Sequence, residues 1–267
     1  MDDSEFGKED QRGFWKPNSL IRYPDVFVWP PNLLGVLRWV PNYLFPLGIA
    51  YALLALVVWT WLTPSIPIMQ TLSADWILYI FARNVAFITL VVGGQHVWLY
   101  VKKAQGTSFK YNRKWPAPKA PGFAFGSQLK DNLFWTFCSG VPIWTAWEVL
   151  TLWLYSNGYI AGLVSTDNPI WFVALWFMVP LLHELHFFCI HRMIHWPPLY
   201  KRIHKIHHRN INPGPWSGLS MHPIEHLIYF SGFLIYWIVP AHPLHFMHLS
   251  LMAGLAPAQG HTGFDRI

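Results

Sequence analysis

The chain has 267 residues, of which 53% are hydrophobic and only 12% are charged. Soluble domains carry about twice that charged fraction, and the apolar residues here come in long blocks, so the composition favours an integral membrane protein. The net charge of +6 does not predict a nucleic-acid partner, because the basic residues lie in loops beside apolar blocks. The acidic start is unlike a cleavable signal peptide, and Cys138 and Cys189 offer no disulfide framework.

Residues 1–42 are polar and then rich in Trp and Pro, which predicts a tail and an interfacial segment. Four apolar stretches then have about the length that a bilayer requires: 43–62, 76–100, 133–155 and 170–190. A longer apolar run at 227–255 contains Pro240 and Pro243. Two half-length helices that enter the membrane and return fit this run better than one straight span.

The expected fold is therefore an all-α integral membrane protein with about four transmembrane helices and a broken re-entrant hairpin. We expect the tail at 1–42, a transmembrane bundle at 43–182 and a histidine-rich catalytic region at 183–267. Connections 63–75 and 156–169 contain no Lys or Arg, so the positive-inside rule places the tail, the basic loop at 101–131 and a histidine-rich helical cap on the cytoplasmic side. The membrane would be the endoplasmic reticulum of a eukaryote or the inner membrane of a bacterium.

Two charged residues fall inside predicted spans. Arg83 and Glu148 lie at similar depths from the outer ends of the second and third spans. An intramembrane charge needs a partner, so we predict that the two side chains form an ion pair. This pair is expected to be structural and remote from the histidines.

The histidines gather in one stretch, since nine of the fourteen lie between Leu182 and Leu227. Residues three or four apart share one face of a helix, and such spacings recur three times. The candidate metal ligands in this stretch are His191, His195, His204, His207, His208, His222 and His226. Imidazole suits Zn, Cu, Fe and Ni, and so many ligands exceed the roughly three that one catalytic zinc takes. The pattern favours two metal ions.

Two motifs in this stretch resemble those of zinc proteases, but neither predicts a protease-type zinc site. His183 and Glu184 begin an HExxH pattern, but Phe187 stands where the second histidine belongs. HPIEH at 222–226 matches HxxEH, yet Pro223 predicts that His222 is a helix-start residue. Oxidation of an unactivated hydrocarbon needs a redox metal, which zinc is not, so a lipid substrate would favour iron.

The segment from Glu184 to His226 resembles the fatty acid hydroxylase / sterol desaturase superfamily of membrane di-iron oxygenases. Glu184 stands seven residues before an HRxxH at 191–195, a KxHH follows at 205–208, and an HP pair stands at 222–223. His261 lies in a GHTG segment that is similar to a later histidine position of the family. The resemblance covers about the last 90 residues; the preceding part is similar only in being hydrophobic.

The resemblance implies two non-haem iron ions, O2 as the oxidant, a lipid substrate and an external electron donor of the cytochrome b5 or ferredoxin kind. It adds His261 to the seven candidate ligands. Glu184 and Glu225 would be the catalytic-site carboxylates that orient ligand imidazoles. Hydroxylation and desaturation both begin with hydrogen abstraction, so the sequence does not separate a fatty acyl or sterol hydroxylase from a desaturase.

Alternatives remain open at this point. Family members carry a final HxxHH beyond the GHxG turn, whereas this sequence stops at Ile267, so we expect either a fragment or substitute ligands such as His242, His245 and His248. Interfacial histidines are the simpler interpretation of those three. A membrane zinc hydrolase using residues 222–226 is a second possible function. A metal carrier or sensor without enzymatic activity is a third.

Overall fold

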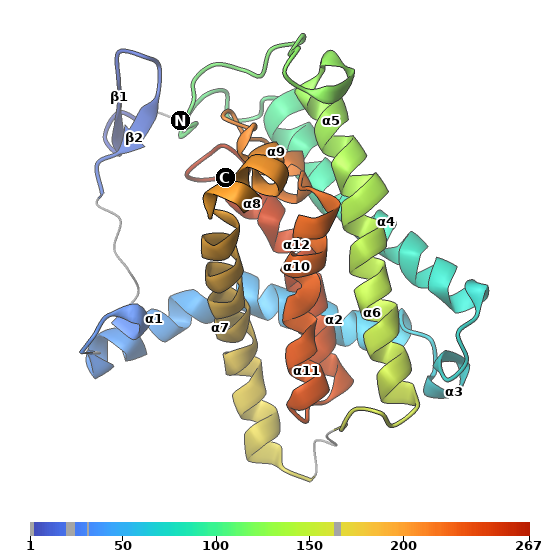
Figure 1. Cartoon of the computed structure of the whole chain (residues 1–267). Coiled ribbons are helices and arrows are strands. Elements are labelled where there is room, and N and C mark those ends of the chain that lie inside the picture. The colour runs from blue at the N-terminus through green and yellow to red at the C-terminus, as the bar shows by residue number, and fades with distance from the viewer. Residues whose placement is uncertain (1–2, 20–24, 31, 163–166) are drawn as a thin grey trace.

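The structure is a computed structural model that describes residues 3–19, 25–30, 32–162 and 167–267, and it is mostly helical (Figure 1). The α-helices are α1 (Leu33–Leu44), α2 (Leu47–Trp61), α3 (Ile66–Met69), α4 (Ala74–His96), α5 (Gln128–Trp135), α6 (Val141–Ser156), α7 (Pro169–Ile194), α8 (Pro197–Leu199), α9 (Lys205–His208), α10 (Pro223–Phe230), α11 (Ile235–Ile238) and α12 (Pro243–Gly260). Short 3-10 and π segments are η1 (Asp25–Phe27), η2 (Val97–Val101), η3 (Ala124–Gly126), η4 (Thr136–Gly140), η5 (Tyr200–His204), η6 (Pro215–Leu219) and η7 (Ser231–Leu234).

Two helical segments in the described part of the chain are long and apolar enough to cross a membrane, Ala74–Val101 and Pro169–Ile194. They correspond to the predicted spans at 76–100 and 170–190. The predicted span at 43–62 is found as a bent pair, Leu33–Leu44 and Leu47–Trp61, whose axes differ by 48°. Counted as one broken span, this pair gives up to three crossings. Its first helix also begins inside the region predicted as an interfacial tail.

The predicted span at 133–155 lies in the helical run formed by α5, η4 and α6, but this run is not among the candidate spans. The prediction of four crossings and a cytoplasmic cap therefore stays a prediction. This helical run packs closely in the core. Trp144 on α6 is fully buried, and a Cβ added to Gly254 of α12 would lie 2.6 Å from the Trp144 indole. Any larger residue at position 254 would push the two helices apart.

The run at 227–255 forms a helical hairpin, as predicted. Helices α10 and α11 with η7 make the first arm, and α12 makes the second. Pro243 occupies the first turn of α12, and the His242 side chain caps that helix by accepting a hydrogen bond from the Leu244 amide at 3.1 Å. Both α10 and α12 contact α7 (Figure 1). Whether the hairpin re-enters the membrane remains a prediction.

A small antiparallel sheet, β1 (Gly7–Glu9) and β2 (Trp15–Pro17), corrects the all-α expectation. The sheet is held against the loop after η2: the Trp15 amide donates to the Tyr111 carbonyl at 2.8 Å. Arg113 of that loop forms an ion pair with Asp3 at 2.9 Å. The predicted tail is thus ordered where it is described; residues 1–2, 20–24 and 31 lie outside the described residues.

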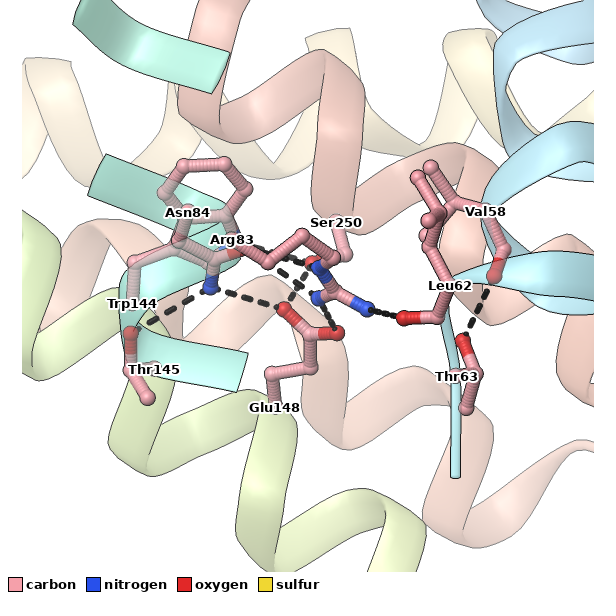
Figure 2. Close-up of polar contacts among 9 residues, drawn as sticks. All are labelled: Val58, Leu62, Thr63, Arg83, Asn84, Trp144, Thr145, Glu148 and Ser250. Atoms are coloured by element: carbon pink, nitrogen blue, oxygen red, sulfur yellow. Dashed lines mark hydrogen bonds and ion pairs between the residues drawn. The ribbon is translucent and has the colours of Figure 1, made fainter. Parts of the chain in front are cut away.

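A buried polar network joins four helices and confirms the predicted Arg83–Glu148 ion pair (Figure 2). Arg83 also donates to the Leu62 carbonyl at 3.0 Å and to the Asn84 amide oxygen. The second carboxylate oxygen of Glu148 accepts from Asn84 at 3.0 Å and from Ser250 at 3.3 Å. Because both charges are desolvated but fully hydrogen-bonded, this network fixes α2, α4, α6 and α12 relative to one another.

A buried lysine ties the loop after η2 to the segment that follows the histidine cluster. Lys110 is fully buried, and its ammonium donates to the carbonyls of Asn112 and Lys114 and to the side chain of Asn212 at 3.0 Å. It also lies over the ring of Trp115 at 5.5 Å, a favourable cation–π distance. This anchor fixes the basic loop next to the candidate site.

Candidate metal centre

Four imidazoles meet where α7 ends. His191 and His195 come from the end of α7, His204 from η5 and His208 from α9, and each offers one ring nitrogen within 4.8 Å of the others. The Nε2 atoms of His191 and His195 are 3.0 Å apart, and those of His208 and His195 are 3.2 Å apart. Four of the predicted ligands therefore come together in the structure, and we call them the four-histidine group.

The local sequence explains this convergence. Helix α7 ends at Ile194. Helix α8 begins only three residues later, with Trp196 as its N-cap and Pro197 and Pro198 in its first turn, where proline is favoured. The chain then winds through the π segment η5 into α9. A π turn shifts the facing of later side chains relative to an α-helix, and His204 and His208 both come to face the end of α7.

Glu225 of α10 orients one member of this group. Its Oε1 atom lies 2.6 Å from Nδ1 of His204, and the two side chains are 4% and 1% exposed. The proton on Nδ1 is held by the carboxylate, which leaves the lone pair of Nε2 free. In the described part of the chain, that buried Nε2 atom has no hydrogen-bond partner. A carboxylate–histidine pair with a free distal nitrogen is the arrangement that metal-binding histidines show.

The donor chemistry fits a metal ion. Neutral imidazole nitrogens packed lone pair against lone pair repel each other, whereas ligands at about 2.1 Å from one ion lie roughly 3 Å apart. The separations of 3.0 and 3.2 Å fit ligands of one ion, and without an ion they allow N–H···N hydrogen bonds. A transition metal among these four nitrogens would also satisfy the unpartnered Nε2 of His204.

A second pair of histidines lies beside the first group. The Nε2 atoms of His207 and His261 are 3.1 Å apart, and Nδ1 of His261 donates to the Pro257 carbonyl at 2.6 Å. Because Nδ1 then carries the proton, Nε2 of His261 is the acceptor nitrogen, and it faces His207. The rings of His204 and His207 are stacked with centroids 5.5 Å apart, so the pair adjoins the four-histidine group. The pair offers two further imidazole nitrogens next to that group.

Burial keeps the second pair neutral. Burial lowers the pKa of His207 well below its ordinary value, and the neighbouring His261 lowers it further. Burial also lowers the pKa of His261. Metal ions bind the neutral form of imidazole, so the desolvated environment favours the form that the metal needs.

A cavity of ≈ 250 Å³ connects the two groups with the hydrophobic core. Its walls include His191, His204, His207 and His261, and it is otherwise mainly apolar: Phe187, Ile190, Ile194, Met221, Tyr229 and Ala256. Such a lining fits a hydrocarbon better than a polar ligand.

The two candidate carboxylates differ. Glu184 lines the cavity, yet among the described residues no hydrogen bond joins it to a histidine, whereas Glu225 bonds His204. His183 also lines the cavity and was not predicted as a site residue. The sequence could have indicated this position of His183, because His183, Phe187 and His191 are spaced four residues apart and share one face of α7.

His222 and His226 lie apart from both groups. His222 is the N-cap of α10, as Pro223 predicted, and its Nδ1 accepts from the Ile224 amide at 3.2 Å. Both nitrogens of the buried His226 have partners, Ser139 at 2.9 Å and the Leu219 carbonyl at 3.2 Å. Neither histidine lines the cavity beside the cluster.

The substitute ligands considered for the family's last motif also lie elsewhere. His242 caps α12, and Nε2 of His245 donates to the Phe172 carbonyl at 2.9 Å. His248 is buried against Trp176, with ring centroids 5.2 Å apart. These three histidines are not part of the metal-binding group found in the described residues.

Together, these features describe a helical protein with candidate membrane spans and a histidine cluster that could hold metal ions beside a largely apolar cavity. Residues 176–267 match the fatty acid hydroxylase family. This match and the relatives below support the similarity to the fatty acid hydroxylase / sterol desaturase superfamily that the motifs predicted.

Three relatives illustrate the match. The chain is 38% identical over 175 residues to Delta(7)-sterol 5(6)-desaturase erg3C of Aspergillus fumigatus, covering 62% of this chain and 52% of that protein. It is 28% identical over 131 residues to C-4 methylsterol oxidase erg25 of Schizosaccharomyces pombe, covering 44% and 43%. It is 40% identical over 58 residues to human fatty acid hydroxylase domain-containing protein 2, covering 22% and 17%. The chain spans at most about half the length of these relatives, and no solved structure matches it.

Proposed function

We propose that this protein is a membrane-bound di-iron oxygenase that hydroxylates or desaturates a lipid, using O2 and electrons from an external donor. The observation that carries the proposal is the four-histidine group with Glu225 behind His204. Its relatives include a sterol desaturase and a methylsterol oxidase, which favours a sterol or a similar lipid as substrate.

In this proposal, the four-histidine group holds one iron ion, and His207 and His261 contribute to a second. Bound iron would supply the O2-dependent oxidation of a C–H bond, which side chains alone cannot perform. The protein's own residues position and protect this chemistry: Glu225 fixes the ring of His204, and the Pro257 carbonyl fixes that of His261. The apolar wall of the cavity excludes water and holds a hydrocarbon segment beside the imidazoles.

The electron donor would approach the exposed side of the four-histidine group. His195 and His208 are exposed, as are Lys201, Arg202 and Lys205 nearby. A basic rim around exposed ligands favours an acidic partner, because complementary charge speeds and orients docking. We propose a cytochrome b5-like or ferredoxin-like donor on the cytoplasmic side, with the protein in the endoplasmic reticulum of a eukaryote or the inner membrane of a bacterium.

The two alternative functions receive less support. A zinc hydrolase would need His222, Glu225 and His226 together, but these side chains have separate partners: the Ile224 amide, His204 and Ser139. A metal carrier needs ligands that release the ion easily. The buried, carboxylate-oriented His204 suits a resident ion better.

The test combines metal analysis with lipid mass spectrometry. The purified chain should contain two irons, and cells expressing it should contain a lipid with an added oxygen or double bond. His207→Ala should lose about half of the iron and all of the product. His242→Asn is the matched control, because asparagine preserves the helix cap at a histidine far from the centre; it should retain both iron and product.

The alternatives predict different results. One tightly held zinc per chain with no lipid oxidation would favour the hydrolase, and readily exchanged metal would favour the carrier. If the His207→Ala protein kept two irons and full product, the assignment of the second metal position would be wrong.

A further inference from the structure

A second cavity, of ≈ 240 Å³, lies where the α1–α2 bend, α7 and α12 meet. Its walls are apolar apart from one imidazole and one phenol, and include Leu44, Ala52, Trp176, Phe177 and His248. It shares no lining residue with the cavity beside the metal centre. Because His248 lies roughly 18 Å along α12 from Gly260, at about 1.5 Å per residue, it is out of reach of the histidine cluster.

His248 is the unusual member of this lining. Its side chain is 2% exposed, and neither ring nitrogen has a hydrogen-bond partner among the described residues. The other two histidines near the start of α12 each have a partner on at least one nitrogen: His242 caps the helix, and Nε2 of His245 bonds the Phe172 carbonyl. A buried polar group without a partner costs stability, so a partner from outside the chain would explain why an imidazole stands in this apolar wall.

The position of the cavity indicates what can reach it. Trp176 and Phe177 lie roughly 10–12 Å along α7 from Pro169, at about 1.5 Å per residue, well inside the roughly 30 Å of a hydrocarbon core. Phe177 and the nearby Phe45 and Leu47 are exposed apolar side chains on the same elements. The mouth of the cavity therefore faces acyl chains, and a ligand arriving there is a lipid.

The chemistry of the imidazole selects the polar group of that lipid. A neutral imidazole has one N–H donor and one acceptor nitrogen, and an uncharged hydroxyl can donate or accept. A carboxylate or phosphate would be costly to bury here, because no cation lines the cavity among the described residues. We propose that this cavity is a lipid-binding site separate from the metal centre, in which His248 hydrogen-bonds the hydroxyl of a membrane alcohol, either a sterol or a long-chain alcohol.

Saturation binding to the purified chain in detergent tests the proposal. The probes are tritiated cholesterol and tritiated hexadecan-1-ol, each displaced by its unlabelled form and by the matching hydrocarbon, cholest-5-ene or hexadecane. One probe should bind saturably, and its hydrocarbon should compete about 10-fold more weakly, which is the value of one neutral hydrogen bond. The probe that binds identifies the source of the hydroxyl.

Two variants and one control locate the binding. His248→Phe keeps the ring but removes the hydrogen bond, so affinity should fall about 10-fold. Ala52→Phe adds a ring to the cavity and leaves His248 itself unchanged, so it should abolish saturable binding while leaving the iron content unchanged. Leu53→Phe adds the same ring at the adjacent residue, which is 59% exposed, and should bind like the wild type.

Several outcomes would overturn the proposal. Equal competition by alcohol and hydrocarbon would show that no hydroxyl is recognised. Saturable binding that survives Ala52→Phe would place the lipid in the cavity beside the metal centre instead. Absence of saturable binding by either probe would mean that water alone satisfies His248. None of these readouts requires oxidation activity, so failure of the proposed function would leave them interpretable.

Discussion

Replacing Arg83 with methionine is the sharpest test of what holds the helical bundle together. Arg83 is buried, at 7% exposed, and the substitution keeps much of the side chain's length but removes the guanidinium. Glu148, fully buried, would keep only its hydrogen bonds from Asn84 at 3.0 Å and Ser250 at 3.3 Å. The Leu62 carbonyl and the Asn84 amide oxygen would also lose donors.

An uncompensated buried charge dominates the expected cost. Breaking a buried ion pair by removing one partner costs about 3–5 kcal/mol. This is a large share of a total stability that is typically about 5–15 kcal/mol. At about 2–4 °C per kcal/mol for a chain of this size, the apparent Tm should fall by roughly 6–20 °C. The exposed pair of Lys16 and Asp10, 3.9 Å apart, should be worth under about 1 kcal/mol, so Lys16→Met serves as the control.

The double variant Arg83→Met, Glu148→Met separates charge from packing. Removing both charges should restore most of the loss, with about 1–3 kcal/mol remaining because the Asn84 amide oxygen keeps no donor. Thermal unfolding of detergent-extracted protein, followed by size-exclusion chromatography, measures all variants in one buffer. The reasoning would be refuted if Arg83→Met melted within 2 °C of the wild type, or if the double variant were as unstable as the sum of the singles.

Three further predictions concern the metal centre and its surroundings. Glu225→Gln should weaken iron binding about 10–100-fold without unfolding the chain, since the lost carboxylate no longer orients His204; iron titration measures this, and unchanged affinity would remove Glu225 from the site. His222→Asn should retain iron and Tm because asparagine also caps helices, whereas His222→Leu should lose about 1 kcal/mol of stability but no iron; iron loss in both variants would instead make His222 a ligand. Because burial lowers the pKa of His207, protons should compete with the metal only at acidic pH; iron content should hold from pH 8 to pH 6 and fall below that, and loss already at pH 7 would contradict the neutral, buried state.

The parts of the fold that the sequence predicted are those governed by local spacing. The lengths of two apolar stretches predicted the spans that contain α4 and α7, and Pro240 and Pro243 predicted the turn of the hairpin before α12. The four-residue spacing of His191 and His195 placed two ligands on one helical face. The Arg83–Glu148 pair was predictable because a bilayer leaves an intramembrane charge few possible partners.

The parts that were missed depend on contacts between distant residues. The β1–β2 sheet exists because it packs on a loop about 100 residues away, which no strand pattern in a polar tail would reveal. His226 follows the spacing of a ligand, but the fold turns it toward Ser139. The selection of Glu225 rather than Glu184 as the partner of His204 likewise depends on how α10 packs against η5.

The distribution of unpaired polar atoms carries the functional argument further than spacing does. In the Arg83–Glu148 network every charged atom has a partner among the described residues, as a structural element requires. Beside the metal centre, His204 Nε2, His207 Nδ1 and one Glu225 oxygen are buried without partners. Buried polar atoms without partners also occur elsewhere in the described residues, so it is the grouping of three of them beside converging imidazoles that points to a ligand. The unpaired atoms mark a place where the protein gives up stability to bind something that it does not itself contain.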